Sequence, residues 1–231
     1  MGTTAVDPIT PAAEADQSDR RARHVELSCR ALDLTVSVLA LIVLAPVMLV
    51  IAVAIRLESS GPVVFRQRRL GRAQAPFVVR KFRTMRHGVS HDVHREFVLS
   101  LIAGARPLQA NGKPRFKLVS DDRVTRVGSF LRSTSLDELP QLWNVVRGEM
   151  SLVGPRPPIP YEVEHYPAHW FARFAVKPGI TGLWQVSGRS ELTLEEMIAL
   201  DAEYVRLRSP WLNLRILVRT VPTVLSRRGA S

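Results

Sequence analysis

Cysteine and aromatic residues are scarce in this sequence. Among 231 residues there is one cysteine, Cys29, and 6% of the residues are aromatic. A single cysteine cannot form an internal disulfide, and no cysteine pair is available for a structural zinc site. Because 46% of the residues are hydrophobic and 23% are charged, the composition also excludes a wholly disordered chain.

The common signatures of nucleotide-binding and hydrolytic enzymes are missing as well. The sequence contains no Gly-x-Gly-x-x-Gly, no Walker phosphate loop, no Gly-x-Ser-x-Gly and no His-Glu-x-x-His. The usual dinucleotide-binding domains, P-loop proteins, serine hydrolases and zinc proteases are therefore excluded as first hypotheses.

Acidic residues are outnumbered, and the excess positive charge is concentrated in one region. Lysine and arginine total 32 against 21 acidic residues, which gives a net charge of +11. Most of the excess lies between Arg56 and Arg86, directly after an apolar run. Nucleic-acid binding would also suit a basic chain, but no nucleic-acid-binding motif is present. We therefore expect anionic lipid as the partner of these cations, and no nucleic acid.

The apolar run extends from Leu34 to Ile55 without an ionisable side chain. As a helix it would be about 33 Å long, enough to cross a hydrocarbon core of about 30 Å. A cleaved signal peptide fits poorly, because an acidic segment precedes the run. Arginines flank the run on both sides, so both flanks resemble cytoplasmic loops. Pro46 lies near the middle and favours a kink. The residues alone leave a spanning helix and a re-entrant helix equally open.

The rest of the chain predicts short elements of both kinds. Residues 59–71 and 76–82 have the pattern of extended segments joined by a turn. Residues 94–104 and 125–133 have the apolar spacing of helices. Residues 210–228 predict a helix with an apolar face, which suits either the protein core or a membrane surface.

Two adjacent carboxylates are the best candidates for chemistry. Asp137 and Glu138 follow Ser135, and Ser135 with Glu138 has the spacing of a helix capping box, which is the structural interpretation. The functional alternative is that both carboxylates hold a divalent cation beside a phosphate. Arg156, between two prolines, suits a rigid phosphate contact.

Three histidines, His87, His91 and His94, have the spacing of a helical metal site. A solvated polar spacer explains the same residues, and the presence of Gly88 favours that explanation.

Several motifs together resemble those of one family. They are Gly61-Pro62-Val63, Phe65-Arg66-Gln67, Lys81-Phe82-Arg83-Thr84-Met85, Thr125-Arg126-Val127-Gly128, the run Ser135 to Asn144, the run Gly148 to Pro157, and Lys177 to Gly182. In this order the sequence, from about Arg30 to Ala230, resembles the bacterial sugar transferases, the monotopic polyprenyl-phosphate phosphoglycosyl transferases.

The resemblance implies an activity. Such an enzyme transfers a sugar 1-phosphate from a UDP-sugar to undecaprenyl phosphate, releases UMP, and begins the synthesis of an exopolysaccharide or another glycan. Asp137 would be the nucleophile that forms a phosphosugar-aspartyl intermediate, and Glu138 the Mg²⁺ ligand. Because a carboxylate and a diphosphate repel each other, cations must neutralise the phosphate. Mg²⁺, Lys81, Arg83 and Arg156 are our candidates.

The resemblance also implies a membrane arrangement. We expect a mostly helical protein with a short β element: a flexible tail (1–24), a re-entrant membrane helix (25–58) hinged at Ala45 and Pro46, and a small cytosolic α/β-type catalytic domain (59–231) with interfacial helices, its C-terminal helix membrane-associated. The location would be the inner leaflet of the bacterial cytoplasmic membrane.

Some positions depart from the family pattern. Relatives commonly carry serine before the hinge proline, where this chain has Ala45, and the segment between Met85 and Thr125 carries a longer helical insert. The expected type is a minimal catalytic core without the multispanning region of larger members. The sequence leaves open the sugar, the glycan pathway and the oligomeric state. A homo-oligomer is among the alternatives.

Overall fold

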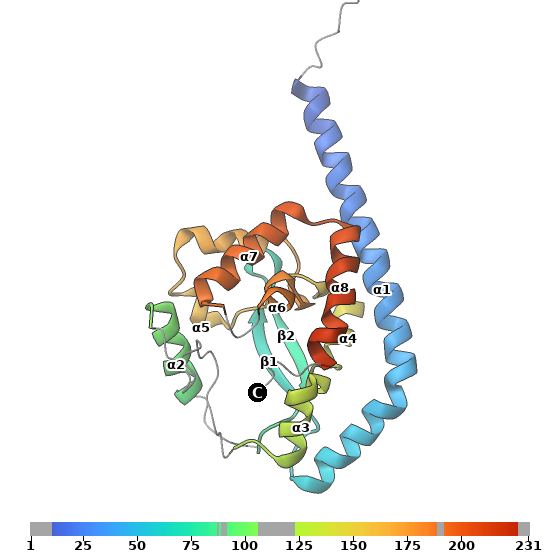
Figure 1. The fold of residues 1–231 in the computed structure, drawn as a ribbon, viewed down its shortest axis with the longest axis vertical. Helices are drawn as coiled ribbons and strands as arrows, with labels where there is room; N and C mark the ends of the chain where they lie inside the picture. The colour runs from blue at the N-terminus through green and yellow to red at the C-terminus, as the bar shows by residue number, and fades with distance from the viewer. Residues whose placement is uncertain (1–10, 87, 89–91, 106–122, 189–191, 226–231) are drawn as a thin grey trace, which may run out of the picture.

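One long helix, α1 (Pro11–Glu58), runs along a side of the molecule and then bends beneath it (Figure 1). The structure is a computed structural model that describes residues 11–86, 88, 92–105, 123–188 and 192–225. The helix ends at Glu58, as expected, but it begins inside the segment expected to be a flexible tail. The alanine, glutamate and arginine residues of that segment are strong helix formers, which explains the difference. Pro46 lies inside α1 and removes one helical hydrogen bond, which is a physical cause for a bend.

The chain after α1 forms a β-hairpin. Strands β1 (Val64–Leu70) and β2 (Pro76–Phe82) pair antiparallel, and the short helix η1 (Arg72–Gln74) joins them. The predicted extended segments are thereby confirmed. In the register of the hairpin, Lys81 lies opposite Phe65 and Pro76 lies opposite Leu70. Lys81 and the turn are therefore at opposite ends of the hairpin.

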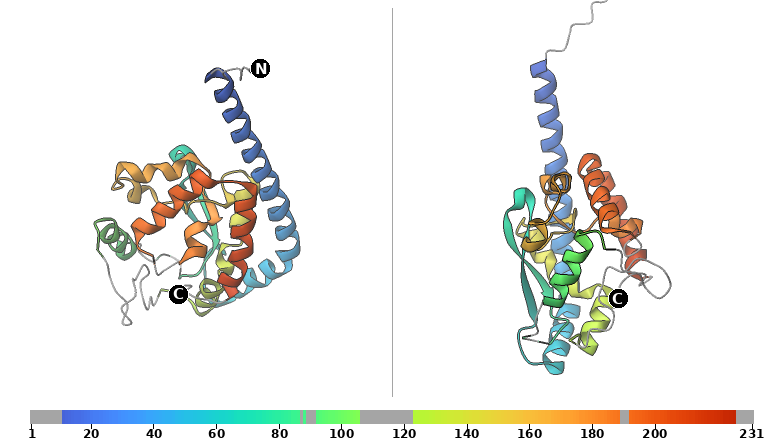
Figure 2. Two further views of the ribbon diagram at one scale, coloured as in Figure 1. Left: turned by 45° about the horizontal axis from the view of Figure 1, so that its top comes forward. Right: turned by 90° about the vertical axis from the view of Figure 1, so that its left-hand side faces the viewer.

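Helices make up most of the remaining described chain. A second sheet is formed by β3 (Ser151–Val153) and β4 (Gly179–Thr181), which are parallel. In the right view of Figure 2 the hairpin and helix α8 lie on opposite sides of the molecule. The predicted helices near residues 94–104, 125–133 and 210–228 are confirmed as α2, α3 and α8. The other elements are helices, with these bounds: α2 (Asp92–Ile102), α3 (Arg126–Thr134), η2 (Leu136–Glu138), α4 (Gln141–Val146), α5 (Pro160–Val163), η3 (Ala168–Ala175), α6 (Leu183–Ser187), α7 (Leu194–Leu207) and α8 (Pro210–Leu225).

Two hydrophobic clusters form the core, and α1 contributes to both. The larger cluster is centred on Val145, Met150 and Tyr204, and the part of α1 before Pro46 packs against it. The smaller cluster contains Ile51 and Ile55, which follow Pro46 on the same helix. Burial of apolar area is the main stabilising contribution in such clusters. Helix α1 is therefore packed against the domain on both sides of its proline.

Buried polar contacts attach the first part of α1 to the domain. The carboxylate of Asp33, which is 3% exposed, accepts hydrogen bonds from Ser151 Oγ at 3.0 Å and from the Leu152 backbone N–H at 2.9 Å. Arg30 donates to the carbonyl oxygens of Val145 and Val146 in the last turn of α4. Carbonyl groups at a helix end lack some of their intrahelical partners, and Arg30 supplies a donor to both, in addition to the Gly148 N–H that also binds the Val145 carbonyl.

We predict that Asp33→Ala destabilises the protein by about 2–4 kcal/mol, because the substitution leaves the Leu152 N–H and the Ser151 hydroxyl buried without their acceptor. Asp19→Ala, at an exposed position of the same helix, is the control. Thermal unfolding of both variants in detergent measures the difference. Equal stability of the two variants would contradict the prediction.

Candidate active site

Asp137 and Glu138 lie in the tight turn η2 between α3 and α4. Ser135, directly before the turn, has φ of 57°, a left-handed conformation that is uncommon for residues other than glycine. Its side chain makes no capping hydrogen bond. The capping box expected from Ser135 and Glu138 is therefore wrong, because Ser135 adopts a left-handed conformation instead of the extended one that a capping residue needs. The two carboxylates instead lie in a half-buried 3-10 turn, three residues before α4 begins at Gln141.

Lys81 faces this turn from the end of β2. Its Nζ lies 2.7 Å from Oε1 of Glu138, and both side chains are 29% exposed. The structure thus joins two of the residues proposed from the sequence, one from the hairpin and one from the helical part. An ion pair that remains partly exposed contributes little to stability, but it leaves a cation beside the carboxylates.

The carboxyl group of Asp137 is a weaker acid than an ordinary aspartate. Burial, and then the neighbouring Glu138 carboxylate, raise its pKa to about 6, while the positive charges of Lys81 and Arg132 act in the opposite direction. A strongly shifted carboxyl that is next to specific cations is typical of a functional site. Asp137 is therefore mostly ionised at neutral pH, and its ionised form raises the free energy of the folded state.

Arg132 was missed by the sequence analysis as a site residue. It lies in the last turn of α3, its Nε donates to Thr84 Oγ1 at 2.9 Å, and its charge acts on Asp137. Helix α3 lies close to the segment after β2. If Gly128 had a Cβ atom, that atom would be 2.0 Å from the Thr84 carbonyl oxygen, which is too close for two packed atoms. The sequence signal that could have identified Arg132 was its position five residues before Asp137.

Arg83 has a different environment from the one expected. Its guanidinium is buried, and Nη2 donates to Ser59 O at 2.7 Å and to Ser59 Oγ at 2.8 Å. These contacts cover the end of α1, where a positive charge is favourable for the helix dipole. In this geometry Arg83 attaches the end of α1 to the segment directly after β2, which differs from the predicted phosphate contact.

Arg156 is not brought to the carboxylate turn. The backbone around it is held by two buried arginines: Arg173 Nη2 donates to Arg156 O at 2.8 Å, and Arg69 Nη1 donates to Pro157 O at 2.9 Å. The Leu70 N–H donates to Pro158 O at the turn end of the hairpin. That end is about 17 Å along the strand from the position of Lys81. The Arg156 side chain is exposed there.

In the described part of the chain, no group of three or more His, Cys, Asp or Glu side chains gathers as a metal site. His87 and His91 lie outside the described residues, and the side chain of His94 is also not described, so the histidine site is not tested. Mg²⁺ commonly binds one or two carboxylates and completes its shell with water and phosphate oxygens. The two carboxylates of η2 fit that donor set.

Comparison with known proteins identifies the family. A family profile described as bacterial sugar transferase matches residues 25–227. A UDP-glucose:undecaprenyl-phosphate glucose-1-phosphate transferase of Caulobacter vibrioides is 42% identical over 214 residues, covering 89% of this chain and 73% of the relative. The exopolysaccharide production protein ExoY of Sinorhizobium fredii is 39% identical, with 88% of each chain covered.

Some relatives are much longer. A UDP-galactose-lipid carrier transferase of Erwinia amylovora is 44% identical over 202 residues, which are 87% of this chain but 41% of the relative. The match to the family profile nevertheless includes α1 from residue 25 onward, the hairpin, the carboxylate turn and α8. The chain belongs to the bacterial sugar transferase family.

Proposed function

We propose that this protein transfers a sugar 1-phosphate from a UDP-sugar to undecaprenyl phosphate, as an early membrane step of exopolysaccharide or other glycan synthesis. The observation that carries the proposal is the carboxylate turn, in which Asp137 has a pKa raised to about 6 beside Lys81 and Arg132. The names of the Caulobacter and Erwinia relatives support the substrate classes. The sugar itself is left open.

Asp137 is the proposed nucleophile. Its carboxylate oxygen attacks the phosphorus that bears the sugar, a P–O bond to aspartate forms, and the P–O bond to UMP breaks with its electron pair leaving on UMP. An oxygen of the lipid phosphate then attacks the same phosphorus and releases the aspartate as a carboxylate. Covalent catalysis of this kind lets one site serve a soluble donor and a lipid acceptor in turn.

Lys81 and Arg132 make the attack feasible. Asp137 and the donor diphosphate are both anionic, so their approach is unfavourable without positive charge nearby. The two cations come from β2 and α3, outside the turn that carries the nucleophile. Both residues lie on regular elements of the fold, so their positive charges are beside Asp137 before the donor binds.

Mg²⁺ is the proposed cofactor, with Glu138 as its protein ligand and the donor phosphates as the other anionic ligands. When bound, the ion supplies charge neutralisation on the diphosphate. Glu138 Oε1 lies 2.7 Å from Lys81 Nζ, so the lysine and the metal compete for the same carboxylate. We propose that Lys81 holds Glu138 in place when no donor is present.

The proposed location is the inner leaflet of the bacterial cytoplasmic membrane, with α1 as a re-entrant helix hinged at Ala45 and Pro46. Support comes from contacts at both ends of the apolar run: Arg30 and Asp33 bind the domain before it, and Ser59 binds Arg83 after it. Both ends are then on the domain's side of the membrane. The outer face of the run is exposed and apolar, with Ile42, Val43 and Val50 between 66% and 69% exposed.

Helix α8 is proposed to lie on the same lipid surface. Its exposed apolar side chains include Trp211, Val218 and Val221, which are 59–67% exposed, while Ile216 on the opposite face is 1% exposed and packs in the core. The two interpretations of this helix, core-facing and interfacial, are therefore compatible because they use different faces.

The decisive experiment measures UMP release from a panel of UDP-sugars by the purified protein with Mg²⁺ and undecaprenyl phosphate. We expect release with at least one UDP-glucose, UDP-galactose or N-acetylated donor, and transfer of the sugar phosphate to the lipid. Absence of release with every donor would refute the proposed function.

Replacing the nucleophile should remove activity and increase stability. The pKa of Asp137 is about 6 in the fold and 3.8 in a model peptide, so ionisation above pH 6 destabilises the folded state. We expect Asp137→Asn to abolish UMP release and to raise the unfolding free energy by about 1–2 kcal/mol well above pH 6, after allowance for solvent screening. The gain should vanish as the pH falls below 3.8. Chemical denaturation at several pH values tests this, and a gain that does not depend on pH would contradict it.

The pH profile should report Asp137. The charged groups that act on it are Glu138, Lys81 and Arg132. We expect kcat/KM to fall as the pH decreases through about 6. Lys81→Met removes a charge that lowers this pKa, so the fall should move to higher pH and kcat/KM at the plateau should decrease about tenfold or more. Arg66→Met, at an exposed position on β1, should leave the profile in place. If kcat/KM of Lys81→Met fell at the same pH as in the wild type, the assignment of this fall to Asp137 would be wrong.

The membrane topology can be tested by labelling cysteines with a membrane-impermeant maleimide. Asp19→Cys and Arg68→Cys place exposed residues before and after the apolar run, and the native Cys29 is buried. We expect neither site to react in intact cells and both to react after permeabilisation. Labelling of Asp19→Cys alone in intact cells would establish a spanning helix instead.

A further inference from the structure

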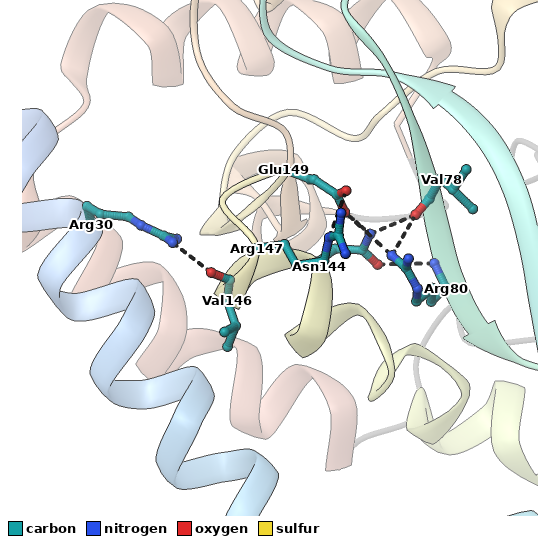
Figure 3. Close-up of polar contacts among 7 residues, drawn as sticks. All are labelled: Arg30, Val78, Arg80, Asn144, Val146, Arg147 and Glu149. Atoms are coloured by element: carbon teal, nitrogen blue, oxygen red, sulfur yellow. Dashed lines mark hydrogen bonds and ion pairs between the residues drawn. The ribbon is translucent and has the colours of Figure 1, made fainter.

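The outer edge of β2 is covered by a side chain. The hairpin has two strands, so the edge of β2 that faces away from β1 carries unpaired backbone groups. The amide of Asn144, from α4, occupies this edge: Oδ1 accepts from the Arg80 backbone N–H at 3.1 Å, and Nδ2 donates to the Val78 carbonyl oxygen at 2.7 Å. Figure 3 shows the amide between α4 and the strand. Asn144 is 0% exposed and acts as a third strand would.

Glu149 orients this amide. Its Oε2 accepts from Asn144 Nδ2 at 2.6 Å and lies 3.5 Å from Arg80 Nη1, while Oε1 accepts from Arg147 Nε at 3.1 Å (Figure 3). A carboxylate can only accept, so the amide nitrogen must face it and the amide oxygen must face the strand N–H. The orientation of Asn144 is therefore defined, and its removal would take the acceptor from the Arg80 N–H and leave the Val78 carbonyl oxygen with the longer 3.4 Å contact from Arg80 Nη1.

The same two chain segments meet again at the candidate active site. Arg80, which Asn144 binds, is followed by Lys81, and the turn that carries Glu138 leads directly into α4, which carries Asn144. The Lys81–Glu138 pair is 29% exposed on each side, whereas Asn144 is 0% exposed and its contacts with Val78 and Arg80 are partly buried. A flexible lysine in a partly exposed pair does not define its own position well. The buried amide contact sets the register that brings the pair together.

We infer that Asn144 is a positioning residue: by binding the edge of β2 it holds Lys81 at Glu138 and beside Asp137. The inference rests on the proposed function for its effect on catalysis. The placement of Lys81 is a claim of its own, and it can be tested without any substrate.

The first test measures how fast the Lys81 amine is acetylated, by mass spectrometry, in the full chain. We expect Asn144→Ser to increase the rate at Lys81 at least about threefold, in the same direction as Glu138→Gln, which removes the partner directly. Asn213→Ser is the matched control, because Asn213 is a buried asparagine of α8 that accepts from Tyr204. An unchanged rate in Asn144→Ser, or an equal increase in Asn213→Ser, would overturn the inference.

The second test is a double-mutant cycle on kcat/KM of UMP release. Asn144→Ser should reduce kcat/KM about tenfold in the wild-type background and less than about threefold in Lys81→Met, because its effect acts through the lysine. Equal losses in both backgrounds would mean a general structural role and would overturn the inference.

The two tests separate the inference from the proposed function. Failure of the wild type to release UMP refutes the function, while the acetylation rates still decide the placement of Lys81. If Asn144→Ser does not unfold cooperatively, Glu149→Gln replaces it in both tests. That variant keeps an acceptor for the amide but removes the charge, so we expect a smaller change in the same direction. No change at Lys81 in Glu149→Gln would then count against the inference.

Discussion

The packing of α1 against the domain on both sides of Pro46 is the constraint on which the rest of the structure depends. One part of the helix completes the larger hydrophobic cluster, and the part after the proline completes the smaller one. Arg30 and Arg83 reinforce the two contacts with hydrogen bonds to helix ends. Arg30 of α1 donates to α4, and Arg83, directly after β2, donates to the end of α1. The helix proposed to enter the lipid therefore also supports the elements that carry the site.

Electrostatic cost explains the arrangement of the carboxylate turn. Burial and the adjacent Glu138 disfavour the ionised form of Asp137, and Ser135 adopts a left-handed conformation directly before it. Both features cost free energy in the folded state, as is common where function and stability compete. The neighbouring cations offset part of the cost, and they are the groups that a transferring phosphate would need. The electrostatic cost at Asp137 and the proposed chemistry therefore have one physical origin, a partly buried carboxylate beside cations.

Local pattern was sufficient for much of the fold. The hairpin segments, the helices near residues 94–104, 125–133 and 210–228, and the end of the long helix at Glu58 were predictable, because period and turn residues act over a few positions. The start of α1 was not, because its polar residues lack apolar period but have good helix propensity. The capping box at Ser135 was wrong, since a left-handed residue overrode a local preference.

What the sequence determined by itself was the set of motifs: the family resemblance, the apolar run with its proline, and the carboxylate pair with Lys81 as candidates. What only the tertiary structure decided was which charges meet. It joined Lys81 to Glu138, added Arg132 to the surroundings of Asp137, bound Arg83 to Ser59, and left the Arg156 side chain exposed at the other end of the hairpin. Residues far apart in the chain meet through strand register, helix packing and buried contacts such as that of Asn144. These long-range constraints leave no periodic signal along the sequence, so a charge in a motif identifies a candidate but not its partner.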